Sequence, residues 1–261
     1  MAAQDQTALW SALEALDQPT LATLFADPAR LDAYAATLDL PGGPIRFDWS
    51  KTHLSPAVEA VLADLAQATD FAGKRAELLS GAKINNTEGR AAEHTAQRGV
   101  GAEASVEEAD ALHARMALLV DAIHEGLLGE VKSLIHIGIG GSALGPALAI
   151  DALAREDAKV AVHVVSNIDG CALEAAMKQC DPATTLIALA SKTFTTTETM
   201  VNAASALEWL REGGVADPYG RVIALTAAPE KAVEWGVDET RILPFSETVG
   251  GRYSLWSSIG F

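Results

Sequence analysis

The stretch "SLIHIGIGGSALGP", residues 133–146, joins a short apolar run to three closely spaced glycines and then to a segment of helical composition. The apolar run at 133–139 is typical of a β-strand that is buried on both faces. Gly138, Gly140 and Gly141 allow a tight turn and a close approach of the backbone to a ligand. Strand, glycine turn and helix in this order form the usual layout for an anion at a helix N-terminus.

The same alternation of strand and helix continues along the chain after this stretch. Apolar runs predict further strands at 160–166, 184–190, 221–227 and, more weakly, 240–245. The segments between them predict helices at 142–155, 170–179, 196–211 and 229–235. Because crossovers between parallel strands are right-handed, we expect a five-stranded parallel sheet in a three-layer α/β/α sandwich. Ligands of such sheets bind at the carboxyl ends of the strands.

The chain before the first strand favours helices that pack on the sandwich and do not form a separate domain. One helix begins with Ser55 as its cap and Pro56 in its first turn. A later helix begins with a capping box formed by Ser105 and Glu108. We therefore expect three regions along the chain. An N-terminal helical region covers 1–130, the sandwich covers 131–245, and a glycine turn with the start of an apolar helix covers 246–261.

Composition and charge exclude several classes of function. The net charge of −16 argues against nucleic-acid binding, because phosphate backbones need a basic face. The sequence shows neither a signal peptide nor an apolar run of 18 residues, so we expect a cytoplasmic protein that does not span a membrane. Cys171 and Cys180 are expected to be reduced thiols, and no group of residues has the spacing of metal ligands.

The stretch "ASKTFTTTETM", residues 190–200, follows the third predicted strand directly. Hydroxyl groups, an ammonium and free backbone N–H groups surround one point, and the side chains come from Ser191, Lys192, Thr193 and Thr196. A lysine about 4 Å from an anion supplies about 4 kcal/mol of gross attraction at an effective dielectric constant of 20. A helix dipole supplies roughly 0.3–1 kcal/mol, so Lys192 should dominate anion binding.

The same stretch also explains the start of a helix. Thr195 and Glu198 fit a capping box and place the helix start near residue 196. The alternative to an anion site is therefore a capped helix with a solvated lysine. Thr197 and Thr199 have no role that the sequence assigns.

The glycine turn leaves two interpretations open. Ser142 can cap the following helix or donate to a ligand. Residues 138–143 also match the dinucleotide-binding pattern G-x-G-x-x-A. That pattern needs an acidic residue at the end of the second strand, where this chain has Ser166 and Asn167, and Asp169 comes late and fits a helix cap. Nucleotide binding is therefore disfavoured.

Two further stretches carry charged side chains. In "ETVGGRYSLWSSIG", residues 247–260, Arg252 follows two glycines and fits either a fixed charge for an oxyanion or phosphate, or a surface arginine. In "KINNTEGRAAEHTAQR", residues 83–98, His94 and Arg98 are four residues apart and share one helical face. A lone histidine is more often structural than catalytic, and the role of His94 stays open.

In these four stretches the sequence resembles the phosphoglucose isomerase family. The blocks "GKIN-TE-RA--H", "IGIGGSxLGP", "ASKTFTTxET" and "VGGRYSLWSxIG" look like that family's blocks and occur in the family's order. The resemblance runs from about residue 45 to the end. It implies a flavodoxin-like sheet in a sugar-isomerase (SIS) domain. It also implies the interconversion of glucose 6-phosphate and fructose 6-phosphate, which is a step of glycolysis and gluconeogenesis. The reaction would pass through a cis-enediol and need no metal or organic cofactor.

The resemblance also implies roles for individual residues. Arg252 would stabilise negative charge on the enediolate. Gly141 and Ser142 would contact the substrate. The sugar phosphate would be held by Ser191, Lys192, Thr193 and Thr196.

Two features depart from the family pattern. Ala92 and Glu93 replace an apolar pair that usually precedes His94, which is a change in packing. The family's catalytic glutamate and its ring-opening histidine lie beyond the last block, so we expect a truncated isomerase that lacks the base and is inactive alone. The intact protein is expected to be a homodimer. The competing hypothesis is a non-catalytic module that binds sugar phosphates.

Overall fold

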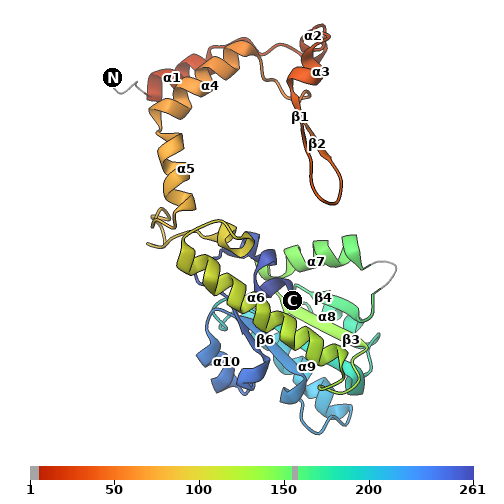
Figure 1. The fold of residues 1–261 in the computed structure, drawn as a ribbon. Helices are drawn as coiled ribbons and strands as arrows, with labels where there is room; N and C mark the ends of the chain where they lie inside the picture. Colours follow the sequence, from red (N-terminus) through yellow and green to blue (C-terminus); the bar gives the residue numbers. More distant parts are fainter. Residues whose placement is uncertain (1–5, 155–157) are drawn as a thin grey trace. The chain divides into compact units, whose positions relative to one another are not determined.

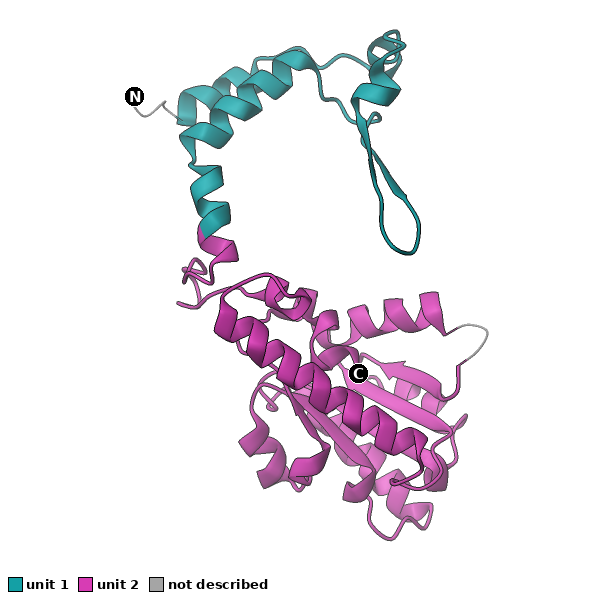
Figure 2. Ribbon diagram, viewed as in Figure 1, with its two compact units in different colours: residues 1–76 teal, residues 77–261 magenta. Residues whose placement is uncertain are grey.

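The computed structural model describes residues 6–154 and 158–261. The chain forms two compact units, residues 1–76 and 77–261, drawn in teal and magenta in Figure 2. Helix α5, Phe71–Leu79, crosses the boundary between them. The second unit contains all the stretches that the sequence singles out for chemistry, so their geometry can be described within one unit.

The first unit combines short helices with a β-hairpin (Figure 1). Helix α4 begins as predicted, because Ser55 Oγ accepts the Val58 N–H at 3.4 Å and Pro56 is the first helical residue. Helix α1 packs against α4. The elements are α1 Gln6–Glu14, α2 Leu21–Leu24, α3 Arg30–Ala33, β1 Ala35–Leu38, β2 Ile45–Asp48 and α4 Pro56–Ala68.

The hairpin differs from the helical character expected of this region. Strands β1 and β2 are antiparallel, and Ala35 lies opposite Asp48. The connection between them contains Pro41 and Gly43, and Gly43 has a φ of +119°. Proline interrupts a helix and glycine adopts a positive φ without strain, so turn chemistry overrides helical propensity here. For the helices of the first unit, the predicted packing on the sandwich stays a prediction.

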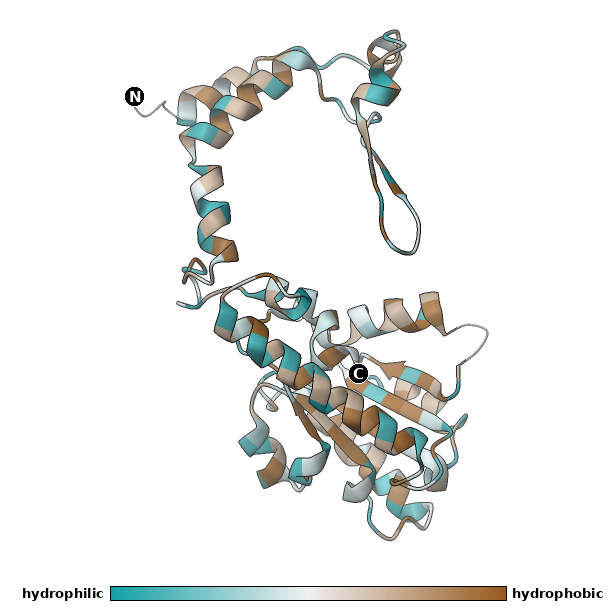
Figure 3. Cartoon of the chain, viewed as in Figure 1, coloured by the Kyte–Doolittle hydropathy of each residue, from teal (hydrophilic) through white to brown (hydrophobic). Residues whose placement is uncertain are grey.

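The second unit is built on a parallel sheet, as predicted. The sheet of the described residues has five strands in the order β4-β3-β5-β6-β7, and every neighbouring pair is parallel. Figure 3 shows hydrophobic residues gathered in these strands, and β3, β5 and β6 are buried along their whole length. The strands are β3 Ser133–Gly138, β4 Ala161–Val165, β5 Thr185–Ala190, β6 Val222–Thr226 and β7 Ile242–Pro244.

Helices cover both faces of this sheet and complete the three layers (Figure 1). On one face Leu119 of α6 packs with Leu186 and Ile223 of the sheet, and α7 also contacts β3 and β4. On the other face Leu173 of α8 and Leu207 of α9 pack against the strands, and α10 joins them. The helices are α6 Glu103–His124, α7 Gly141–Leu153, α8 Gly170–Met177, α9 Thr197–Glu212 and α10 Pro229–Trp235.

Short 3₁₀-helices connect or extend these elements. The apolar helix expected after Arg252 is instead a 3₁₀ segment with a kink at Tyr253. Residue 155, the last of the predicted 142–155 helix, lies outside the described residues. The 3₁₀ segments are η1 His94–Arg98, η2 Pro182–Thr184, η3 Tyr219–Arg221, η4 Glu239–Arg241, η5 Gly251–Trp256 and η6 Ser258–Gly260.

The capping box predicted for α6 is wrong. The helix begins at Glu103, and its N-cap is Ala102, which has no side-chain oxygen. Ser105 Oγ instead donates to Glu93 Oε1 at 2.6 Å. A capping hydroxyl would have to stand at the N-cap and accept a backbone N–H, whereas Ser105 lies inside the first turn and donates. Glu93, which departs from the family pattern, thus ties the segment before η1 to α6.

Candidate functional site

The site lies between two neighbouring strands, β3 and β5, whose following connections run to opposite sides of the sheet. From β3 the chain crosses to β4 on one side of the sheet, and then returns past β3 to β5 on the other. Gly138 and Ala190 are register partners at the carboxyl ends of β3 and β5. The loops that leave these two strands therefore diverge from a common point. Crevices of this kind are where ligands bind in open α/β sheets.

The first loop carries the glycine turn into α7. Gly140 has a φ of +57°, which favours glycine over other residues. A Cβ on Gly141 would lie 2.2 Å from the carbonyl carbon of Gly251, so the turn packs directly on the backbone of η5. Ser254 Oγ lies 3.2 Å from the Gly141 carbonyl oxygen and donates to it. The glycine at 141 is thus needed for contact within the protein, in addition to any contact with substrate.

The strand before this turn also holds the helix. His136 of β3 is 1% exposed, and its Nε2 lies 2.7 Å from the Ser142 carbonyl oxygen. Because a carbonyl oxygen only accepts, the imidazole donates and is protonated at Nε2. Burial lowers the pKa of His136 below its ordinary value, and the bond to Ser142 opposes that shift. His136 therefore stays neutral and fixes the first turn of α7.

The second loop gathers the hydroxyl groups that the sequence predicted. Ser191 Oγ and Thr196 Oγ1 are 3.1 Å apart, and Thr193 Oγ1 and Thr195 Oγ1 are 2.8 Å apart. Ser191 is buried, whereas Thr193 and Thr195 are exposed. The predicted capping box of Thr195 with Glu198 is wrong, because Thr196 is the N-cap of α9. The hydroxyls pair with one another because the loop folds them side by side before the helix begins.

Lys192 reaches from this loop to the segment before η5. Its Nζ donates to the carbonyl oxygens of Glu247 at 2.6 Å and Val249 at 2.9 Å. Burial, followed by the charge of Arg90, lowers the pKa of Lys192 below its ordinary value. An ammonium has three N–H donors, so two are used on the backbone and one remains for an anion.

The stretch 83–98 closes the site from a third direction. His94 of η1 is half-buried, and its Nε2 accepts the Gly250 N–H at 2.7 Å. The His94 ring also packs edge to face on Tyr253, with 5.3 Å between ring centroids. Arg252 lies between these two contacts and is exposed. Tertiary structure thus brings the four motif stretches together at one end of the sheet.

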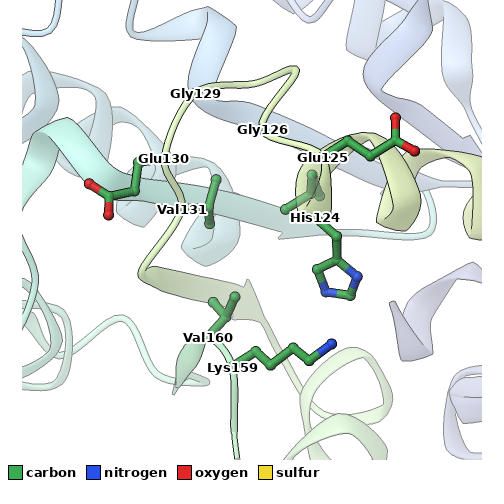
Figure 4. Close-up of a pocket in the computed structure, with 9 residues that line it drawn as sticks. His124, Glu125, Gly126, Gly129, Glu130, Val131, Lys159 and Val160 are labelled. Atoms are coloured by element: carbon green, nitrogen blue, oxygen red, sulfur yellow. The ribbon is translucent and has the colours of Figure 1, made fainter.

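A separate cavity of about 410 Å³ lies at the opposite end of the sheet. Figure 4 shows His124, Glu125 and Glu130 around it, with the Lys159 side chain reaching toward His124. Its lining includes residues just before β3 and β4, and therefore marks the amino ends of the strands. The cavity contains none of the predicted site residues.

The described residues give no sign of a metal centre or of a membrane span. Among residues 6–154 and 158–261, no group of three or more His, Cys, Asp or Glu side chains is placed to hold a metal ion. No helix in the described part of the chain is both long and apolar enough to cross a membrane.

Comparison with known proteins shows which family this chain is related to. The model of the family "Phosphoglucose isomerase" matches residues 48–261. Glucose-6-phosphate isomerase of Novosphingobium aromaticivorans is 84% identical over 252 residues, which cover 97% of this chain and 50% of the relative. The enzyme of Zymomonas mobilis is 56% identical, with the same coverage of both chains. This chain therefore spans about half the length of the curated relatives it matches.

A solved structure agrees in fold. The crystal structure of a glucose-6-phosphate isomerase from Chlamydia trachomatis has a TM-score of 0.79 and 21% identity, and covers 99% of this chain and 51% of that one. At that identity the likeness shows the fold alone. The family match and the identity to the curated relatives decide the relationship, and this chain belongs to the phosphoglucose isomerase family.

Proposed function

We propose that this chain is part of an aldose–ketose isomerase that interconverts glucose 6-phosphate and fructose 6-phosphate. The observation that carries the proposal is the meeting of the hydroxyl-rich loop of β5 with the segment that bears Arg252, through the two hydrogen bonds of Lys192. One side of the crevice then offers donors for a phosphate, and the other offers the exposed guanidinium of Arg252. A sugar phosphate has its two reactive features, the phosphate and the carbonyl carbon, at opposite ends.

The phosphate is proposed to bind at the start of α9. The first N–H groups of an α-helix lack intrahelical partners and the helix dipole favours an anion there. Ser191, Thr193 and Thr196 add hydroxyl donors, and Lys192 adds a charged one. Such a cluster overcomes the repulsion of a protein with net charge −16, because charges beyond about 8 Å are screened at physiological salt.

The reaction proposed for the other end of the sugar is a proton transfer. A carboxylate removes the proton from carbon 2, a cis-enediol forms, and the proton returns at carbon 1. Arg252 would stabilise the negative charge that develops on the oxygen, with Gly141 and Ser142 beside the sugar. We propose that the carboxylate comes from the half of the relatives' length that this chain does not span.

The experiment is an isomerisation assay of the intact protein in heavy water. We expect fructose 6-phosphate to form from glucose 6-phosphate and to carry solvent deuterium at carbon 1, because a proton held by a carboxylate exchanges with solvent. The 261-residue chain alone should bind the sugar phosphate without turnover. Binding without turnover by the intact protein would favour a non-catalytic module, and turnover by the short chain would show that it contains a base.

The remaining expectations extend this proposal. We infer that the intact enzyme is a cytoplasmic homodimer and works without cofactor, which the family relationship supports. Light scattering coupled to size-exclusion chromatography would give the mass of the particle. Full activity after dialysis against a metal chelator is the expected outcome, and a loss restored by a metal would overturn it.

A further inference from the structure

His94 is a motif residue to which neither the sequence nor the proposed reaction gives a role. Its Nε2 accepts the N–H of Gly250, and its ring packs on the edge of Tyr253. These two partners flank the dipeptide Gly251-Arg252 on either side. His94 thus contacts the chain immediately before and immediately after the proposed catalytic arginine.

The hydrogen bond to Gly250 requires a particular state of the imidazole. An N–H donor needs an unprotonated ring nitrogen, so the neutral ring carries its proton on Nδ1. Burial, followed by the charge of Lys192, lowers the pKa of His94 below its ordinary value, and Arg98 acts in the same direction. Burial and the neighbouring cations together outweigh the opposing effect of the Gly250 hydrogen bond on this pKa, and they favour the neutral form that accepts.

Other contacts fix the same segment and leave the arginine side chain exposed. Lys192 holds the carbonyl of Val249, the residue before Gly250. Gly141 packs against Gly251, as the 2.2 Å approach of a Cβ there shows. Arg98, one turn after His94, places its guanidinium 5.9 Å from the ring centre of Trp256. The backbone around Arg252 is thus held from η1, α7 and the β5 loop.

We propose that His94 is a positioning residue that orients Arg252 by anchoring Gly250 and Tyr253 on both sides of it. The inference rests on the proposed isomerase function, because it assigns Arg252 to the charge that develops on the substrate. A guanidinium stabilises that charge only when its donors are fixed before the reaction. A shift of about 1 Å at such a group costs roughly a hundredfold in rate.

The test compares two variants of the intact protein. His94→Leu removes the acceptor and keeps apolar bulk, whereas His94→Gln keeps an oxygen that can accept the Gly250 N–H. We expect His94→Leu to lower kcat roughly 10- to 100-fold with little change in KM, because the phosphate donors lie on the 191–196 loop. His94→Gln should recover most of kcat. Equal kcat in the wild type and His94→Leu would overturn the proposal.

His113→Leu is the matched control. His113 Nε2 lies 2.7 Å from the carbonyl oxygen of Trp256 and so also bonds η5, but beyond the arginine. We expect its kcat to stay within about twofold of the wild type, since the backbone beside Arg252 keeps its anchors. An equal loss of kcat in His113→Leu and His94→Leu would show general support of η5 and contradict a specific role.

A measurement independent of activity separates this inference from the proposed function. With histidine labelled in ¹⁵N, the Nε2 signal of His94 at pH 7 should be that of an unprotonated acceptor, and the Gly250 amide should shift in His94→Leu. A protonated Nε2 would overturn the anchor even in an active enzyme. A wild type that lacks turnover but shows the acceptor signal would refute the proposed function and leave the anchor intact.

Discussion

Lys192 shows how one side chain serves two parts of a site. Two of its three N–H donors hold the carbonyls of Glu247 and Val249. The third is free to bind an anion beside Ser191 and Thr193. Its position therefore couples the proposed phosphate loop to the segment that carries Arg252, a link that the spacing of residues in the sequence does not reveal.

Replacement of this lysine tests the phosphate assignment. We expect Lys192→Ala to weaken sugar-phosphate binding by about 1.5–3 kcal/mol, the range for a hydrogen bond to a charged group. That is roughly a 10- to 150-fold rise in Kd, measured by titration calorimetry. An unchanged affinity would contradict the assignment.

Lys231→Ala is the control for general charge. Lys231 belongs to helix α10, and its Nζ donates to the Thr193 carbonyl oxygen of the same loop at 3.2 Å, so it is a neighbouring cation. If any nearby positive charge is enough for binding, Lys192→Ala and Lys231→Ala should lose affinity for the sugar phosphate equally. We expect the Lys231→Ala variant to change Kd by less than about threefold, because exposed charges contribute about 0–1 kcal/mol.

Phe194 shows that the same loop is held under strain. Its φ is +53°, an uncommon value for a bulky residue, yet its side chain is 4% exposed and packs edge to face on Trp235 at 6.0 Å. The left-handed conformation costs roughly 1–2 kcal/mol. Burial of an aromatic side chain offsets this with about 1.5–3 kcal/mol. The ring thereby fixes the loop that carries the hydroxyls.

At the scale of elements, the bounds of the strands and helices in the sandwich are predicted better than the side-chain caps. The predicted runs contain the observed strands to within two residues at each end, because a strand buried on both faces must be apolar throughout. Helix α10 begins and ends as predicted at Pro229 and Trp235. The capping boxes at Ser105 and Thr195 are wrong because neither residue is the N-cap, and their hydroxyls pair with Glu93 and Thr193 instead.

The contact between α7 and η5 is the packing that the site depends on. Gly141→Ala would place a methyl 2.2 Å from the Gly251 backbone, which cannot move aside like a flexible side chain. We expect a loss of about 1–3 kcal/mol in the free energy of unfolding, the usual result of overpacking. Urea denaturation of the wild type and the variant measures it.

Gly170→Ala is the matched control, because it also lies in the first turn of a helix. A methyl at Gly170 would meet open space within 4 Å. Alanine favours a helix over glycine, so this variant should be neutral or up to about 1 kcal/mol more stable. If both substitutions lowered the free energy of unfolding equally, the loss would come from adding a methyl group at the first residue of a helix. The contact between Gly141 and η5 would then not explain it.

At the scale of the whole molecule, buried histidines link stability to pH. Burial lowers the pKa of His136 and of His94 below the ordinary value of 6.5. The unfolded chain therefore binds more protons than the folded protein once pH falls below about 6.5. Stability from these groups is fully present above that pH and is lost as pH falls toward the lowered folded-state pKa values.

We expect the free energy of unfolding to fall between pH 7.5 and pH 5.5, and to fall less in His136→Gln. Glutamine cannot take up a proton in this range, while its amide N–H can donate to the Ser142 carbonyl oxygen. Urea denaturation at several pH values would give both slopes. Parallel slopes in the two proteins would show that His136 does not contribute to acid sensitivity.

The sequence by itself determined the sandwich and the family. Buried parallel strands need continuous apolar runs, and the glycine turn and the hydroxyl loop follow two of them directly, so local pattern sufficed. Only the tertiary structure decided which polar atoms meet. His94 and Gly250 are 156 residues apart, and Lys192 and Val249 are 57 apart. A hydrogen bond between distant residues depends on the position of whole elements, which no local periodicity encodes.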